Sequence, residues 1–337
     1  EPIDELERAY KLASAQAKAD PAFAAAARAE LAKLQRGDAE NRAQWERFVA
    51  ATRTSLDQIY DRFGVKFDVW LGESAYEPML PGVIEELKQR GLAREDQGAL
   101  CVFFEGAALN KSPMIVQKSD GAYLYATTDI ATLFYRRDHF HADRAIYLTD
   151  ARQVLHFKQV FALAKALGMN LALTHITFGS VLGKDGKPLK TRAGDAIRLA
   201  ELLDEAENRA SERLLRAREE QVIDLDDAAI AALAPVVGIG AVKYADLMQN
   251  RTSDYRFDWD KMISFKGNAG PYLQYAHARI AAIFRKADLT LDALEIPETL
   301  SLEEPAERAL AKQLLRFGDV VHTAAEQSLP HLLCEHL

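Results

Sequence analysis

Short apolar runs alternate with amphipathic helical segments between residues 66 and 182, and no other feature of the sequence restricts the fold as much. The apolar runs lie at 67–71, 100–104, 144–148 and 174–182. Runs that are apolar along almost their whole length are typical of strands in a parallel sheet covered by helices. Helical patterns at 128–139 and 151–167 separate the last of these runs. The sequence therefore predicts an α/β fold whose ligands bind at the carboxyl ends of parallel strands.

Helical patterns fill the chain on both sides of this region. In residues 1–65, apolar residues recur every three or four positions in three segments, which predicts three helices that pack in a core. Asp20-Pro21 predicts the start of the second helix, and Gly64 predicts the end of the third. Further helices are expected at 199–215, 228–248, 270–286, 303–317 and 320–337. A hairpin is expected at 114–125, with its turn at Asp120-Gly121.

Composition and charge restrict the class of protein. The net charge of −8 argues against a protein that coats nucleic acid by bulk charge. The two cysteines, Cys101 and Cys334, lie far apart and form neither a metal-binding spacing nor a disulfide framework, which fits a reducing, cytoplasmic location. We expect the apolar runs to be far too short to span a membrane. We therefore expect no metal centre and no membrane partner.

The two ends of the sequence predict that the chain is part of a longer protein. It opens at Glu1-Pro2 directly into a helical pattern, and it stops at Leu337 inside an apolar helical run without a cap or breaker.

A cationic loop at 183–194 follows the last apolar run. It contains four cations, three glycines and one proline, and Asp185-Gly186 is a turn signal. Lys and Arg side chains on such a loop can follow the charge of a polyphosphate during a reaction. A solvated surface loop explains the same composition, so this segment alone leaves both interpretations open.

A second group of polar residues lies where predicted strands meet predicted helices. Asp129 follows a strand end, where Thr127 or Thr128 could cap the helix and the helix dipole would stabilise the carboxylate. Alternatively, the carboxylate and the neighbouring Tyr125 bind a planar guanidinium through paired hydrogen bonds. At the next junction Asp150 is a potential cap and Gln153 is placed to face the same cleft. His156, in the following helix, reads as a packed or surface histidine.

These segments together carry a resemblance to a known family. The matching stretches are YLYATTDIA at 123–131, DARQ at 150–153 with HF at 156–157, KPLKTRAG at 187–194, GAVKY at 240–244, DYRFD at 254–258 and GNAGPYLQYAHAR at 267–279. Together these stretches are specific for one family, and the resemblance covers the chain from about residue 66 onward. The chain resembles arginyl-tRNA synthetases, which are class I enzymes.

The resemblance implies a fold, a division into domains and a set of site residues. It implies a helical segment at 1–65, the later part of a parallel Rossmann-like nucleotide-binding sheet at 66–197, and part of an all-α anticodon-binding bundle at 198–337. Three residues are implied to bind the arginine substrate: Tyr125, Asp129 and Gln153. Four residues of the lysine-rich loop are implied to hold the pyrophosphate of ATP: Lys187, Lys190, Thr191 and Arg192.

The implied activity is arginine–tRNA ligation, with ATP and Mg²⁺, L-arginine and tRNA(Arg) as substrates, no tightly bound cofactor, and a monomeric protein. The other class I signature, His-x-Gly-His, does not occur in the 337 residues and would precede residue 1. We therefore expect these residues alone not to charge tRNA. Two alternatives remain: another nucleotidylyl-transfer enzyme, or an RNA-binding paralogue of a synthetase that has lost catalysis.

Overall fold

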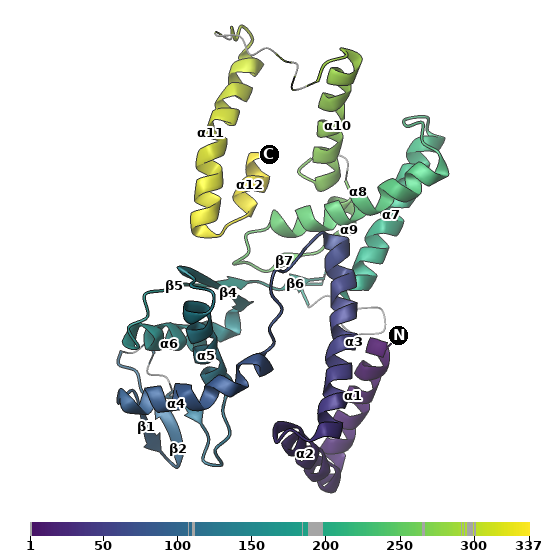
Figure 1. Ribbon diagram of the computed structural model, residues 1–337. Helices are drawn as coiled ribbons and strands as arrows, with labels where there is room; N and C mark the ends of the chain where they lie inside the picture. Colours follow the sequence, from purple (N-terminus) through teal and green to yellow (C-terminus); the bar gives the residue numbers. More distant parts are fainter. Residues whose placement is uncertain are drawn as a thin grey trace. The chain divides into compact units, whose positions relative to one another are not determined.

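A computed structural model of the chain (Figure 1) divides it into two compact units. One unit comprises Glu1–Asp68 and Arg198–Asp204, and the other comprises Val69–Ile197 and Glu205–Leu337. The structure describes residues 2–106, 108–109, 112–183, 185–187, 198–264, 267–290, 292, 294, 299 and 301–337.

The first unit contains the three helices expected at the start of the chain: α1 (Pro2–Ala19), α2 (Pro21–Gln35) and α3 (Ala39–Phe63). The predicted helix ends are confirmed. Asp20 caps α2 by accepting a hydrogen bond from the Ala22 backbone N–H at 2.8 Å, with Pro21 as the first helical residue. Gly64 ends α3 in the left-handed region, at φ 64°, where glycine carries no Cβ penalty.

The predicted core packing of these helices is wrong. None of the described residues of α2 and α3 is buried. Leu31, Phe48 and Val49 are all more than two-fifths exposed. Spacing at three and four residues predicts an apolar face but does not supply the surface that would cover it.

The run at 67–71 was predicted as a strand, and this prediction is also wrong. The segment has no regular secondary structure, and Phe67 and Val69 are each half exposed. An extended apolar run becomes a strand only where a neighbouring strand pairs with its backbone.

The second unit begins with the 3₁₀ helix η1 (Glu73–Met79) and α4 (Leu80–Gln89), followed by three short antiparallel strands. These are β1 (Ala93–Asp96), β2 (Ala99–Val102) and β3 (Met114–Gln117). The run at 100–104 is therefore a strand, but it was wrongly placed in the parallel sheet. Gln97 and Gly98, both at positive φ, form the two-residue turn that pairs β2 back onto β1.

The expected hairpin at 114–125 is only partly formed. β3 and the turn are present, since Gly121 lies at φ 85° and the Lys118 N–H donates to the Ala122 carbonyl. The returning arm is reduced to one bridge between Gln117 and Tyr123 before the chain enters helix α5 (Tyr125–Asp138).

The predicted parallel pairing is confirmed between β4 (Arg144–Asp150) and β5 (Ala172–Phe178). The connection between them is η2 (Ala151–Gln153) and α6 (Val154–Ala166), and α5 and α6 lie beside the two strands (Figure 1). Fully buried side chains from both helices form the centre of the core: Ile130, Leu133, Val160 and Leu163. The run at 174–182 splits into two strands, and its second part, β6 (Val181–Leu182), pairs in parallel with β7 (Tyr255–Arg256).

The last part of the chain is helical, as expected. The helices are α7 (Leu199–Glu219), α8 (Asp227–Leu247), α9 (Trp259–Met262), α10 (Gly270–Lys286), α11 (Pro305–Gln327) and α12 (His331–His336). The boundary predicted between the helices at 303–317 and 320–337 is wrong. α11 continues through Gly318 to Gln327, and its C-cap Ser328 lies in the left-handed region at φ 54°.

α8 is long and apolar enough to cross a membrane by length and composition alone, contrary to the expectation that no run has that length. Its glycines show close helix packing. A Cβ on Gly238 would lie 2.6 Å from the Ala206 carbonyl oxygen of α7, and one on Gly240 would lie 2.6 Å from Nε2 of Gln274 in α10. Such contacts on two sides are typical of a core helix, whose composition is apolar for the same reason.

Candidate active site

Helix α5 carries the first two predicted site residues, Tyr125 and Asp129, and begins earlier than the sequence indicated. Its N-cap is Leu124, so neither Thr127 nor Thr128 caps it. The buried Thr127 hydroxyl instead donates to the Val116 carbonyl oxygen of β3, which ties the start of the helix to the antiparallel sheet. Asp129 therefore lies in the second turn of the helix, where the dipole acts less strongly on its carboxylate.

Asp129 is paired with a histidine that the sequence indicated to be a packed or surface residue. Oδ2 of Asp129 lies 2.6 Å from Nε2 of His156 in α6. The exposed fractions of the two side chains are 26% for Asp129 and 11% for His156. The ring of Tyr125 meets the His156 ring edge-on, with 4.7 Å between centroids. The structure thus brings Tyr125 and Asp129 together around His156.

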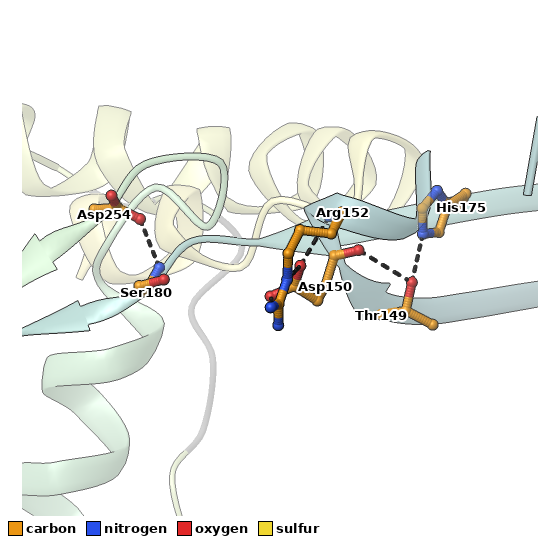
Figure 2. Close-up of polar contacts among 6 residues, drawn as sticks. All are labelled: Thr149, Asp150, Arg152, His175, Ser180 and Asp254. Carbon is orange, nitrogen blue, oxygen red and sulfur yellow. Dashed lines mark hydrogen bonds and ion pairs between the residues drawn. The ribbon is translucent and has the colours of Figure 1, made fainter. Parts of the chain in front are cut away.

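The carboxyl end of β4 carries the next group. Asp150 caps η2, as predicted, by accepting from the Arg152 backbone N–H at 2.8 Å, and it also pairs with the Arg152 guanidinium (Figure 2). The hydrogen bonds from Arg152 hold the pKa of the Asp150 carboxyl below its ordinary value. Gln153, the last residue of η2, has an exposed side chain. That Gln153 binds the same substrate as Asp129 stays a prediction.

A second histidine links the two parallel strands close to His156. Nε2 of His175 in β5 lies 2.7 Å from the Thr149 hydroxyl of β4 (Figure 2), and the His175 ring packs on Phe157 with 4.6 Å between centroids. Burial lowers the pKa of His175, and a positive charge on His156 lowers it further.

The described part of the cationic loop is a tight turn. Gly186 lies at φ 75°, its N–H donates to the Gly183 carbonyl, and the Gly183 N–H donates to the Lys187 carbonyl at 2.7 Å. This confirms the turn predicted at Asp185-Gly186. Lys187 is exposed at its end. Three other predicted loop residues lie outside the described residues: Lys190, Thr191 and Arg192.

Comparison with known proteins decides which family this arrangement represents. A family model described as tRNA synthetases class I (R), catalytic domain, matches residues 1–259, and a DALR anticodon binding domain matches residues 273–337. The chain belongs to the arginyl-tRNA synthetase family. The resemblance in the sequence motifs is thereby confirmed, and so is the fold class, an α/β catalytic part followed by a helical anticodon-binding part.

Individual arginyl-tRNA synthetases are similar over nearly the whole chain. The arginine–tRNA ligase of a Cyanothece species is 46% identical over 341 residues, which cover 99% of this chain and 58% of that protein. The ligase of Idiomarina loihiensis is 45% identical over 343 residues. The chain therefore spans little more than half the length of these relatives.

Two solved arginyl-tRNA synthetases share the fold. The structure from Plasmodium falciparum aligns with a TM-score of 0.80 at 33% identity, covering 91% of this chain and 52% of that one. The structure from Thermus thermophilus aligns with a TM-score of 0.77 at 25% identity, covering 98% of this chain and 59% of that one.

In this synthetase chain the candidate site is formed by side chains from separate helices and strands. His156 and His175 were missed as members of this site. The available signal for His156 was its place three residues after Gln153, in the first turn of α6. Within the described part of the chain, no group of three or more His, Cys, Asp or Glu side chains is placed to hold a metal ion.

Proposed function

We propose that the full-length protein is an arginine–tRNA ligase. It activates L-arginine with Mg²⁺-ATP to arginyl-adenylate and transfers the arginyl group to the 3′ end of tRNA(Arg). The observation that carries the proposal is the Asp129 carboxylate, which is partly buried beside Tyr125 and oriented by His156. Relatives with the same activity in their names, at 45% and 46% identity, support it.

The geometry around Asp129 suits a guanidinium substrate. A carboxylate offers about four lone-pair positions on two oxygens, so one bond from His156 at Oδ2 leaves capacity for the paired donors of a guanidinium. With 26% of its side chain exposed, Asp129 is accessible to a ligand and still partly desolvated. Partial desolvation strengthens a charge-assisted hydrogen bond relative to one in water.

The chemistry needs positioning and charge stabilisation rather than a nucleophile on the protein. The arginine carboxylate attacks the α-phosphate of ATP in line, and pyrophosphate leaves. We propose that Tyr125, Asp129 and Gln153 hold the arginine. We propose that four residues of the loop hold the pyrophosphate of ATP: Lys187, Lys190, Thr191 and Arg192. The three cations among them offset the charge that develops on the departing pyrophosphate.

The proposed partners follow from the two matched domains. The anticodon-binding match at 273–337 supports tRNA(Arg) as the nucleic-acid partner. We propose that the protein is a cytoplasmic monomer that needs no tightly bound cofactor and works without a membrane. We also propose domain limits of 1–65, 66–197 and 198–337, and that these 337 residues alone do not charge tRNA.

ATP–pyrophosphate exchange by the full-length protein tests the proposal. Exchange should depend on L-arginine, and omission of tRNA(Arg) should reduce it, because the family resemblance implies that tRNA is bound before arginine is activated. Exchange that proceeds equally well without arginine would favour another nucleotidylyl transferase. Folded full-length protein that binds tRNA but gives no exchange would favour a paralogue that has lost catalysis.

A further inference from the structure

Arg251 lies in the turn between α8 and β7, and its side chain joins two distant parts of the second unit. Its Nη1 donates to the Thr177 carbonyl oxygen near the carboxyl end of β5, at 2.9 Å. Its Nε and Nη2 donate to the carbonyls of Ser328 and Gln327, at 2.7 and 3.4 Å. All three acceptors are main-chain carbonyls, so the contacts depend on where the backbone lies and on no other side chain.

The main chain around Arg251 also holds the segment that leads into the cationic loop. The Gly179 N–H donates to the Arg251 carbonyl at 2.8 Å, and the Ser180 N–H donates to Oδ1 of Asp254 at 2.6 Å (Figure 2). β6 then pairs with β7, and the Phe257 N–H donates to the Leu182 carbonyl. The chain from the end of β5 to the loop is therefore bound along 251–257.

Close approach between these two segments requires glycine at position 179. A Cβ on Gly179 would collide with the carbonyl group of Ser253. A displacement of the Arg251 turn therefore carries the end of β5 with it, because there is no slack between the two backbones.

The other contacts of Arg251 lie at the carboxyl end of α11. The last carbonyls of a helix lack intrahelical partners and form the negative end of its dipole, so a cation is stabilised there. α11 lies within the anticodon-binding match at 273–337. One guanidinium thus joins the end of an anticodon-domain helix to the strand that precedes the loop.

We propose that Arg251 is a positioning residue that couples the place of α11 to the turn at the start of the cationic loop, and so to the binding of ATP. The inference rests on the proposed function for its readout in activity. A planar guanidinium reaches three carbonyls in a fixed geometry, whereas an ammonium on a flexible stem does not. Arg251→Lys therefore keeps the charge and breaks the coupling.

The test compares full-length Arg251→Lys with Arg308→Lys. Arg308 is a matched control, because its Nη1 also donates to two main-chain carbonyls, those of Leu302 and Glu303, but at the opposite end of α11. Loss of one or two hydrogen bonds at about 1 kcal/mol each predicts that Arg251→Lys raises the KM for ATP roughly 5- to 30-fold in exchange. The KM for arginine should stay within about twofold, and Arg308→Lys should change neither KM.

Hydrogen exchange supplies a readout that does not depend on activity. In Arg251→Lys the amides of Gly179 and Ser180 should exchange faster, and in Arg308→Lys they should not. Equal rises in both KM values, or unchanged amide exchange together with an unchanged KM for ATP, would overturn the inference. Absence of arginine-dependent ATP–pyrophosphate exchange in the wild-type protein would overturn the proposed function. The comparison of amide hydrogen exchange between the two variants would still test the role of Arg251.

Discussion

The substitution Asp129→Asn tests arginine recognition most sharply at a single side chain. It keeps the shape of the side chain but removes its charge, and it can place an amide N–H₂ against the donors of the guanidinium. We expect a large loss in the use of arginine with little effect on ATP, because the proposed ATP contacts lie on the loop after β5 and β6.

The size of the loss follows from the surroundings of Asp129. Removal of one partner from a buried, hydrogen-bonded charge pair costs about 2–5 kcal/mol. Asp129 is 26% exposed, which moves the expected loss toward the lower part of that range, about 2–4 kcal/mol. Since every 1.4 kcal/mol is a factor of ten, kcat/KM for arginine should fall roughly 30- to 700-fold.

Arginine-dependent ATP–pyrophosphate exchange with full-length protein and tRNA(Arg) measures this loss. The control is Asp138→Asn, at the other end of α5, where the carboxylate is 59% exposed and accepts hydrogen bonds from its neighbour Arg137. An exposed pair is worth at most about 1 kcal/mol, so the control should stay within about fivefold of wild type. An Asp129→Asn protein with a kcat/KM for arginine close to that of the control would refute the reasoning.

Three further predictions concern other parts of the chain. His156→Ala should raise the KM for arginine about 5- to 13-fold by releasing the Asp129 carboxylate, a loss of about 1–1.5 kcal/mol, and an equal rise for ATP would count against this role. Gly238→Ala should lower the free energy of unfolding in urea by about 1–3 kcal/mol, because the new Cβ would meet the Ala206 carbonyl. Gly318→Ala, with nothing within 4 Å, should instead raise it by about 0.4–1 kcal/mol, and equal effects would contradict the packing. The pKa of His175 is lowered in the folded state, so the unfolded state binds its proton first as pH falls below about 6.5. The free energy of unfolding should therefore fall as the pH falls below that value, and it should fall less in His175→Gln. The same pH dependence in His175→Gln and wild type would contradict the lowered pKa.

Local rules allowed a large part of the fold to be predicted from the sequence. The caps at Asp20 and Gly64, the turn at Asp185-Gly186 and the cap at Asp150 depend on one residue and its immediate neighbours. The parallel pairing of β4 and β5 was also predictable, since a helix between two apolar runs leaves little other choice.

Features that depend on distant segments were not predictable in the same way. The sequence at 100–104 is as apolar as a parallel strand, but the turn at Gln97-Gly98 pairs it with the antiparallel sheet. The sequences of α2 and α3 predict an apolar face on each helix, but they do not predict whether another segment covers that face. His156 looked like an ordinary helical histidine, because its partner Asp129 is 27 residues away in the sequence.

The central claim is that Asp129 recognises the charge of a guanidinium. L-Citrulline has nearly the shape of L-arginine but a neutral urea group, so exchange with the two substrates isolates that charge. Wild-type full-length protein should prefer arginine by at least about 10³-fold, since a charged partner left unpaired in a site gives discrimination of this order or greater. Asp129→Asn should reduce the preference roughly 30- to 700-fold, the loss expected for arginine itself. A preference for arginine that is unchanged in Asp129→Asn would contradict the account.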